Sequence, residues 1–210
     1  MYKLSIEVVR QSLQRVPDED VYPMAQSHKT TTTLGESYFK RPRLKTYDVF
    51  KGTGLVAELL LREAETLELL LRNPHPNLIQ YHGCKVCRGR IVGLVLKRYR
   101  CTLEEYMKRG NDLSLAGFDG IKLAVHHLHS LRYAHNDIKA DNIMIDADNA
   151  WILVDMDSCQ PFGAKLIMAG DREWIASSPE NDKIALDKLW SEISRHQSEH
   201  VPTSDLKYMP

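Results

Sequence analysis

The clearest periodic pattern lies in residues 55–72, where leucines and alanines recur three and four residues apart with charged residues between them. This spacing places the apolar side chains on one face and is typical of an amphipathic helix. Pro74 and Pro76 follow closely and end it. Similar patterns predict further helices at 102–108, 115–133 and 180–190.

Short apolar runs of strand-like composition lie between these helices. Residues 78–84 and 90–99 flank a basic, glycine-containing turn at Cys87–Arg90, and this arrangement predicts a β-hairpin. Residues 143–157 contain two more short runs around the turn residues 146–149. They predict a second hairpin.

The two ends of the chain are less regular. Residues 17–37 are polar and rich in turn-forming residues, so we expect a loop or a loosely ordered segment. Residues 38–44 predict a short strand, which Pro42 ends because proline removes a donor of the strand ladder. Residues 196–210 are polar and predict a tail.

The amino-acid composition is typical of a folded globular protein. With 210 residues, 43% of them hydrophobic, the chain is long enough for one large domain or two small lobes that share a cleft. Lysine plus arginine equal aspartate plus glutamate at 28 each, so no overall field attracts nucleic acid or anionic lipid. No apolar run approaches the roughly 20 residues of a membrane-spanning helix, and the first residues do not resemble a secretory signal. We expect an intracellular, cytoplasmic protein without nucleic-acid or membrane partners.

Two groups of residues could bind a metal ion. Cys84 and Cys87 form a C-x-x-C pair beside His82, but a zinc site needs a further matching pair, so two small reduced thiols in a strand pair are the preferred interpretation. Three histidines lie within one helical turn at 126, 127 and 129. Their spacing scatters them around the helix, and we expect surface or partly buried side chains.

The most informative chemistry surrounds the second hairpin. Asp137, Lys139 and Asn142 precede it, and Asp155 follows it. Together they offer a base, a cation and two oxygen ligands, which phosphoryl transfer needs because the reaction consists largely of alignment and charge neutralisation. Either Asp or Asn alone would more simply be a turn residue that bonds its own backbone.

These residues lie in a sequence that resembles the eukaryotic protein kinases. HNDIKADN at 135–142 is similar to the catalytic loop H-R-D-L-K-P-E-N, and VDMD at 154–157 stands where D-F-G would stand. HPNLIQYHG at 75–83 resembles the segment after kinase helix αC, and LKRYRCTLEEYM at 96–107 resembles the hinge and the helix after it. The resemblance covers residues 38–185.

The resemblance implies an α+β, bilobal protein kinase-like fold. A small β-rich N-lobe with one αC-like helix would extend to about residue 96, the hinge would be 97–100, and a mostly helical, shortened C-lobe would be 101–195. The kinase-like domain would thus be 38–195, between a poorly defined N-terminal segment at 1–37 and the tail.

The resemblance also assigns roles within the site, with ATP and Mg²⁺ as cofactors. Asp137 would accept the proton of the substrate hydroxyl and Lys139 would steady the transferred phosphoryl group. Asn142 and Asp155 would hold Mg²⁺. The remaining positions would bind ATP: Lys40 on the phosphates, Glu63 orienting that lysine, and the backbone of Lys97, Arg98 and Tyr99 at the adenine. Lys45 and Glu65 are the alternates for the lysine and its partner.

The sequence departs from the kinase pattern at several positions. No G-x-G-x-x-G precedes Lys40, and only Gly35 lies nearby. Asn136 replaces the arginine that would read an activation-loop phosphate. Asp157 replaces the glycine of D-F-G and is either a further metal ligand or a surface turn residue. SSPE at 177–180 matches A-P-E in part, but a helix begins there at once.

Three functions remain open. The first is an ATP-dependent protein kinase of the serine/threonine type, which the lysine two residues after Asp137 favours. The second is a pseudokinase that acts as a binding or scaffold module, because the Gly-rich loop is missing. The third is a small-molecule kinase of the choline or aminoglycoside type, which Asp157 and Asn136 favour. We predict the first.

Overall fold

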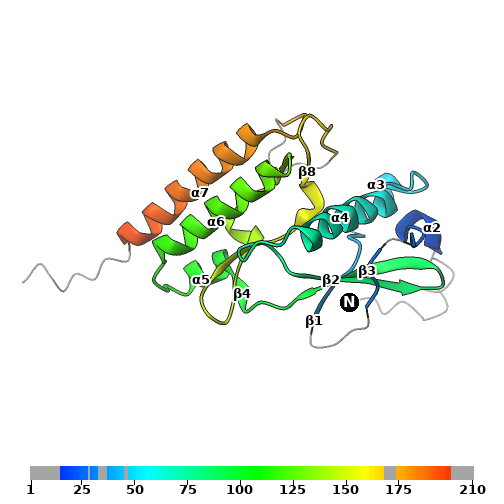
Figure 1. Ribbon diagram of the computed structural model, residues 1–210, viewed down its shortest axis with the longest axis horizontal. Helices are drawn as coiled ribbons and strands as arrows, with labels where there is room; N and C mark the ends of the chain where they lie inside the picture. Colours follow the sequence, from blue (N-terminus) through cyan, green and yellow to red (C-terminus); the bar gives the residue numbers. More distant parts are fainter. Residues whose placement is uncertain (1–14, 28, 33–36, 45–46, 168–173, 200–210) are drawn as a thin grey trace, which may run out of the picture.

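The computed structural model describes residues 15–27, 29–32, 37–44, 47–167 and 174–199. A part built on a three-stranded sheet and a part built on long helices adjoin each other (Figure 1). One continuous hydrophobic core extends through both parts, from Leu60 to Ile193. The α+β class predicted from the sequence is confirmed. None of the helices in these ranges has the length and apolarity to cross a membrane.

The sheet has the order β1-β3-β2, with β1 at Ser37–Lys40, β2 at Tyr81–Cys87 and β3 at Arg90–Lys97. All pairs are antiparallel, and Lys40 lies opposite Leu94. Arg88 and Gly89 both have positive φ at the turn between β2 and β3, as a tight two-residue hairpin turn requires. The predicted first hairpin is confirmed, and β1 lies at an edge of the three-stranded order.

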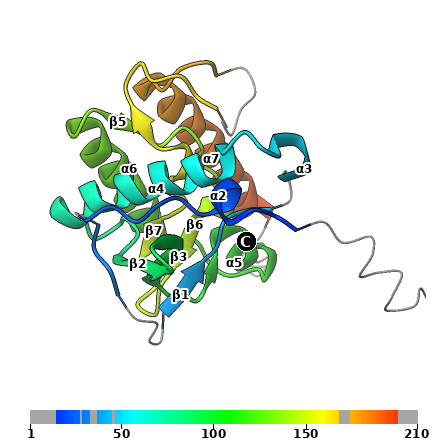
Figure 2. The same cartoon turned by 90° about the vertical axis from the view of Figure 1, so that its right-hand side faces the viewer.

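Helix α4 spans Leu55–Arg72, as the sequence predicts, and packs on the sheet (Figure 2). Its buried face carries apolar side chains such as Leu60, Ala64 and Leu67, which explains the period of its sequence. The same face also buries two carboxylates, Glu63 and Glu68. Buried carboxylates need partners, and both have them.

The segment before the sheet is more ordered than the sequence predicts. A one-turn helix, α2, spans Asp18–Val21, and the extended residues after it contact the β2–β3 hairpin. Met24 bridges Arg90, and the main-chain amide of Cys84 donates to the carbonyl of Thr30 at 2.7 Å. A further one-turn helix, α3, lies at Tyr47–Phe50.

The helical part contains α5 at Leu103–Lys108, α6 at Leu115–Ser130 and α7 at Pro179–Glu199. Helix α5 begins with a capping box, in which Thr102 and Glu105 each accept a hydrogen bond from the other's main-chain amide. Helix α7 continues beyond residue 195, so the first residues of the predicted tail are helical. The rest of that tail lies outside the described residues.

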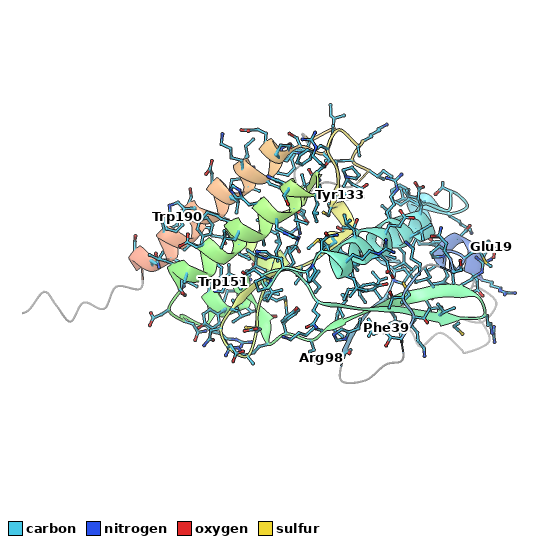
Figure 3. All side chains as sticks on the ribbon, in the orientation of Figure 1. Glu19, Phe39, Arg98, Tyr133, Trp151 and Trp190 are labelled. Carbon is cyan, nitrogen blue, oxygen red and sulfur yellow. The ribbon has the colours of Figure 1, made fainter. Side chains whose placement is uncertain are left out.

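Two small sheets support the loops between these helices. Strands β4 at Cys101–Thr102, β6 at Ile143–Ile145 and β7 at Trp151–Leu153 form one, which confirms the second predicted hairpin. Trp151 packs on α6 where Gly117 leaves room, since a Cβ there would lie 2.5 Å from the indole (Figure 3). Strands β5 at Tyr133–Ala134 and β8 at Gln160–Pro161 form the other. Short 3₁₀ turns follow at η1, Ala140–Asn142, and η2, Met156–Ser158.

Candidate active site

A cavity of about 460 Å³ lies between the three-stranded sheet and the β6–β7 hairpin. Seven of the residues predicted to act at a nucleotide site line it: Lys40, Glu63, Lys97, Arg98, Tyr99, Asn142 and Asp155. They come from β1, α4, the end of β3 and the segment after it, η1 and the loop after β7. The fold therefore brings together residues that are as many as 115 positions apart in the chain.

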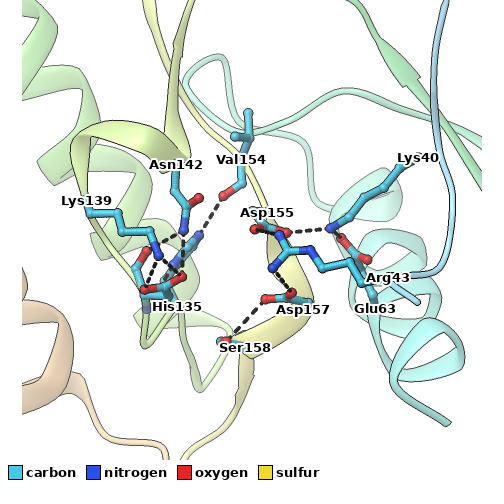
Figure 4. A network of polar contacts seen from close by, with 11 residues as sticks. Lys40, Arg43, Glu63, His135, Lys139, Asn142, Val154, Asp155, Asp157 and Ser158 are labelled. Atoms are coloured by element: carbon cyan, nitrogen blue, oxygen red, sulfur yellow. Dashed lines mark hydrogen bonds and ion pairs between the residues drawn. The ribbon is translucent and has the colours of Figure 1, made fainter. Parts of the chain in front are cut away.

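Lys40 is the centre of an ion-pair cluster in this cavity (Figure 4). Its Nζ donates to Glu63 Oε1 at 2.6 Å and to Asp155 Oδ1 at 2.5 Å. Asp155 has φ 67°, a left-handed conformation that is uncommon outside glycine and that occurs most often at functional sites and turns. The strained residue aims its carboxylate at the lysine.

Burial and charge oppose each other in this cluster. Burial alone would lower the pKa of Lys40, but the carboxylates of Glu63 and Asp155 outweigh it and raise that pKa above its ordinary value. Burial would raise the pKa of Asp155, yet Lys40 and Arg43 hold it below its ordinary value. For Glu63 burial outweighs the opposing effect of Lys40 and, with the negative charge of Asp155 nearby, raises the pKa above its ordinary value.

The alternates for this pair differ in position. Glu65 lies on the exposed face of α4, whereas Glu63 is 4% exposed. Lys45 lies outside the described residues. Lys40 and Glu63 are thus the lysine and glutamate that the structure places in contact.

The segment after β3 borders the opposite side of the cavity. The main-chain amide of Lys97 donates to the carbonyl of Gln80 at 2.9 Å, so this group already has a partner. The Tyr99 hydroxyl accepts from the amide of Gln80 at 3.1 Å, and Arg98 donates to the carbonyl of Ser37 at 3.2 Å. The amide of Lys97 is therefore engaged, and the contact of the Lys97, Arg98 and Tyr99 backbone with adenine stays a prediction.

Asp137 belongs to a second cluster, on the loop between β5 and η1. Both of its carboxylate oxygens accept from Lys139 Nζ, at 2.9 and 2.7 Å. Asn142 Nδ2 donates to Asp137 Oδ2 at 2.8 Å and to its carbonyl at 2.8 Å. Asn142 thereby holds the Asp137 carboxylate in place through its Nδ2, and its amide oxygen takes no part in these two bonds. A smaller hollow of about 210 Å³ lies beside Asp137 and Lys139.

Asp182, near the start of α7, holds this loop through hydrogen bonds. The sequence pattern predicted only that it lies near the start of a helix. It is fully buried, and its carboxylate accepts from the main-chain amides of His135 at 2.9 Å and Asn136 at 2.7 Å. His129 Nε2 lies 2.8 Å from the same carboxylate. His135 in turn contacts the carbonyl of Val154 at 2.9 Å and links the loop to the residue before Asp155 (Figure 4).

Asn136 adds a second set of buried bonds. Its Nδ2 donates to the carbonyls of Ala134 and Ser158 and to Ser177 Oγ, at 2.8, 2.9 and 3.0 Å. Its Oδ1 accepts from Asn181 Nδ2 at 2.9 Å. The residue that replaces a charged arginine of the kinase motif thus joins the loop, η2 and the start of α7 through a neutral amide.

The partial A-P-E match belongs to α7 itself. Pro179 and Glu180 form its first turn, where proline is favoured because the missing N–H has no helical partner there. The match therefore coincides with the beginning of the helix that carries Asp182.

The cysteine pair and the histidine cluster, which could have bound a metal ion outside the cavity, have other contacts in the structure. Cys84 is buried with its Sγ 2.9 Å from the Tyr81 hydroxyl, and Cys87 is exposed. His127 Nε2 contacts the carbonyl of Asn73 at 2.9 Å. Across the described ranges, no three His, Cys, Asp or Glu side chains converge as a metal site.

Arg43 is the site residue that the sequence analysis missed. Its Nη2 donates to Asp155 Oδ2 at 2.7 Å, and its Nη1 lies 3.7 Å from Asp157 Oδ2. Asp155 consequently has both oxygens in use, one on Lys40 and one on Arg43. The only local signal was a basic residue shortly after the proline that ends β1.

The donor types suit Mg²⁺, because Asp155 and Asp157 offer carboxylates and Asn142 an amide oxygen. Arg43, however, contacts both carboxylates. These side chains fit the ion once Arg43 releases Asp155 Oδ2. The glycine nearest to Lys40, Gly35, lies outside the described residues.

Comparisons with known proteins relate this chain to serine/threonine protein kinases, although no protein-family model matches it. It is 26% identical over 184 residues to mitogen-activated protein kinase kinase 7 of Arabidopsis thaliana, an alignment that covers 78% of this chain and 54% of that protein. It is 35% identical over 93 residues to the mitochondrial serine/threonine-protein kinase PINK1 of Rattus norvegicus, covering 40% and 16%. It is 27% identical over 129 residues to the probable serine/threonine-protein kinase MRK1 homolog of Encephalitozoon cuniculi, covering 55% and 39%.

The chain spans about half or less of the length of these relatives. Its mixed fold of small antiparallel sheets and helices agrees with a shortened kinase domain. Several serine/threonine kinase relatives, at low identity and partial coverage, support a protein kinase-like family for this chain.

Proposed function

We propose that this protein is an ATP-dependent protein kinase that transfers the γ-phosphate to a serine or threonine hydroxyl of a protein substrate. The observation that supports this most is that two clusters adjoin the 460 Å³ cavity, the second of them through Asn142. Lys40, Glu63 and Asp155 form one, and Asp137, Lys139 and Asn142 form the other. Phosphoryl transfer needs both a cationic phosphate site and a positioned base.

Each residue has a role that its surroundings support. Lys40 binds the α and β phosphates, and Glu63 holds it in place. Asp137 accepts the hydroxyl proton, oriented by Asn142, while Lys139 neutralises charge on the transferred group. Bound Mg²⁺, held by Asn142 and Asp155, would supply charge neutralisation on the phosphates.

The smaller hollow supports a protein substrate. It is lined by Asp137 and Lys139 together with Trp174 and residues of α7 that include Lys188 and Glu192. An apolar indole between charged side chains can receive a peptide segment, and the hollow lies beside the proposed base. A substrate hydroxyl placed in this hollow would lie beside the carboxylate of Asp137, the proposed base.

The test combines nucleotide binding with phosphate transfer. ATP at a hundred times its dissociation constant should stabilise the fold by about 2.7 kcal/mol, which raises the melting temperature by roughly 5–10 °C for this length. Transfer of labelled γ-phosphate to a generic protein substrate should accompany binding. Asp137→Ala should reduce transfer by about 10²–10⁴-fold, because general-base catalysis contributes that much, while ATP still stabilises the fold.

Asp148→Ala is the matched control, because Asp148 is an exposed carboxylate on the β6–β7 turn. It should leave transfer unchanged. Equal transfer by wild type and Asp137→Ala would contradict the assigned base.

The second candidate is a nucleotide-binding module without transfer activity. The bond from Arg43 to Asp155 favours it, since Asp155 is the proposed metal ligand. ATP stabilisation of the wild type without any transfer of label would select this function. Transfer to a small alcohol or amine in place of protein would select a small-molecule kinase.

A further inference from the structure

The guanidinium of Arg43 lies between two carboxylates of the candidate nucleotide site (Figure 4). One nitrogen is 2.7 Å from Asp155 Oδ2 and the other is 3.7 Å from Asp157 Oδ2. Arginine presents its donors in a planar fork, so a single side chain can bridge two such groups. A cation thus sits on the carboxylates that the sequence assigned to a metal ion.

Charge supports this as a functional position. The cluster contains three carboxylates, on Glu63, Asp155 and Asp157, and two cations, on Lys40 and Arg43. Without Arg43 a single lysine would face all three. Arg43 supplies one of the two positive charges that are then missing.

Arg43 also has groups left for a ligand. Its side chain is 61% exposed, and it lines the 460 Å³ cavity. A guanidinium has five N–H donors, and the contacts with Asp155 and Asp157 engage two of its nitrogens. The remaining donors can contact a phosphate, which arginine recognises well.

A metal ion and Arg43 would compete for the negative charge of Asp155. Mg²⁺ binds carboxylate oxygens at about 2.0–2.1 Å and demands near-octahedral geometry. Asp155 Oδ1 accepts from Lys40 and Oδ2 accepts from Arg43, so a divalent ion on this carboxylate would lie close to two positive charges that repel it. Arg43 is the more exposed of the two, at 61% against 15% for Lys40, and is the one that yields.

We propose that Arg43 occupies the divalent-cation position of this site, so that a nucleoside triphosphate binds without metal and a divalent ion competes with Arg43 for Asp155 and Asp157. This rests on the proposed function, because it assumes that the cavity takes a nucleotide. The proposal adds that nucleotide binding does not need a metal ion, whereas phosphate transfer does. Binding uses Arg43, and transfer requires its displacement.

The experiment compares wild type, Arg43→Ala and Arg41→Ala. Arg41 is the matched control, because it is an exposed arginine two residues earlier and its substitution removes the same charge. Its Cζ lies 5.4 Å from the centroid of the Phe39 ring. The first measurement is Mn²⁺ binding by electron paramagnetic resonance in the absence of nucleotide. The second is ATP affinity by calorimetry, once with EDTA and once with MgCl₂.

For Arg43→Ala we expect Mn²⁺ affinity to rise by about tenfold or more, equivalent to ~1.4 kcal/mol. We expect its ATP affinity in EDTA to fall by at least about tenfold and to recover with MgCl₂. Wild type and Arg41→Ala should bind ATP with nearly equal affinity in the two buffers.

Equal Mn²⁺ affinity in Arg43→Ala and wild type would overturn the proposal. So would a wild-type ATP affinity that depends on MgCl₂ as strongly as that of Arg43→Ala. If none of the three proteins binds ATP in either buffer, the proposed function fails, and with it the nucleotide role of Arg43, while the Mn²⁺ comparison still decides the competition.

Discussion

In the loop at 135–142 the backbone is held by buried hydrogen bonds, whereas around Lys40 and Arg43 the side chains are held by ion pairs. Asn136 and Asp182 are fully buried, and their partners are mostly main-chain groups. Lys40 and Arg43 are 15% and 61% exposed, and their partners are carboxylates. The buried hydrogen bonds fix the conformation of the loop. The ion pairs depend on the balance of charges, which a charged ligand can change.

The energetic reasons differ as well. A buried donor that loses its acceptor pays the full desolvation cost, so the first network resists change. The ion pair of the exposed Arg43 contributes little to folding because water and salt screen it, so Arg43 can exchange partners at small cost. Four substitutions test this difference, from the largest expected effect to the smallest.

Asp182→Ala should have the largest effect on stability. It leaves the amides of His135 and Asn136 buried without acceptors, at about 1–3 kcal/mol each. The free energy of unfolding in urea should fall by roughly 2–6 kcal/mol, the sum of these two costs. Asp187→Ala, on the exposed face of the same helix, should stay within about 0.5 kcal/mol of wild type. A loss below that of Asp187→Ala would show that Asp182 does not anchor the loop.

Asn136→Gly should have the next largest effect. Glycine tolerates the φ of 62° at this position, so the change removes side-chain bonds without backbone strain. Stability should fall by about 1–3 kcal/mol, and hydrogen exchange should accelerate around η2 and Ser177. Asn149→Gly is the control, since Asn149 has φ 61° on an exposed turn. Unchanged exchange around η2 would contradict the proposed link.

Lys40→Met should produce a stability loss that depends on pH. Burial already raises the pKa of Glu63 above 4.5, and without Lys40 the nearby Asp155 and Asp157 raise it further. A raised folded-state pKa favours the fold at low pH and loses that contribution as pH rises through it. The deficit relative to wild type should therefore grow from pH 5 to pH 8, by urea unfolding at each pH. A deficit that shrinks over this interval would refute the burial of Glu63 against Lys40.

Arg43→Ala should have the smallest effect on stability, less than about 1 kcal/mol, because its side chain is largely exposed. Thermal unfolding without ligand measures this directly. A loss as large as that of Asn136→Gly would mean that the loop at 135–142 and the side chains around Lys40 and Arg43 are not held in different ways.

Patterns of short range predicted most of the fold. The helix at 55–72 was predicted with its observed bounds because its buried face repeats at the helical period. Helix α6 ends at Ser130, before the predicted residue 133, because Arg132 takes a positive φ of 66°. The one-turn helices α2 and α3 are too short to show a period.

The candidate site was predictable only where residue types recur in a known motif. Asp137, Lys139 and Asn142 lie within six positions and form a cluster as expected. The contact between Asn136 and Asp182 joins residues 46 positions apart, and that between Arg43 and Asp155 joins residues 112 apart. Such pairs follow from the way the two parts of the fold meet, which spacing along the chain does not encode.

The contact between Thr30 and Glu68 has a consequence for shortened versions of the chain. The amide and hydroxyl of Thr30 donate to the buried Glu68 carboxylate at 2.7 and 3.0 Å, and Tyr81 adds a third bond at 3.2 Å. A truncation that started at Ser37 would strip two of these donors from a carboxylate on α4, the helix that also carries Glu63. Proteolytic trimming past Thr30 would therefore leave the buried carboxylate of Glu68 with a single donor from Tyr81, so a shortened chain that preserves this packing has to include Thr30.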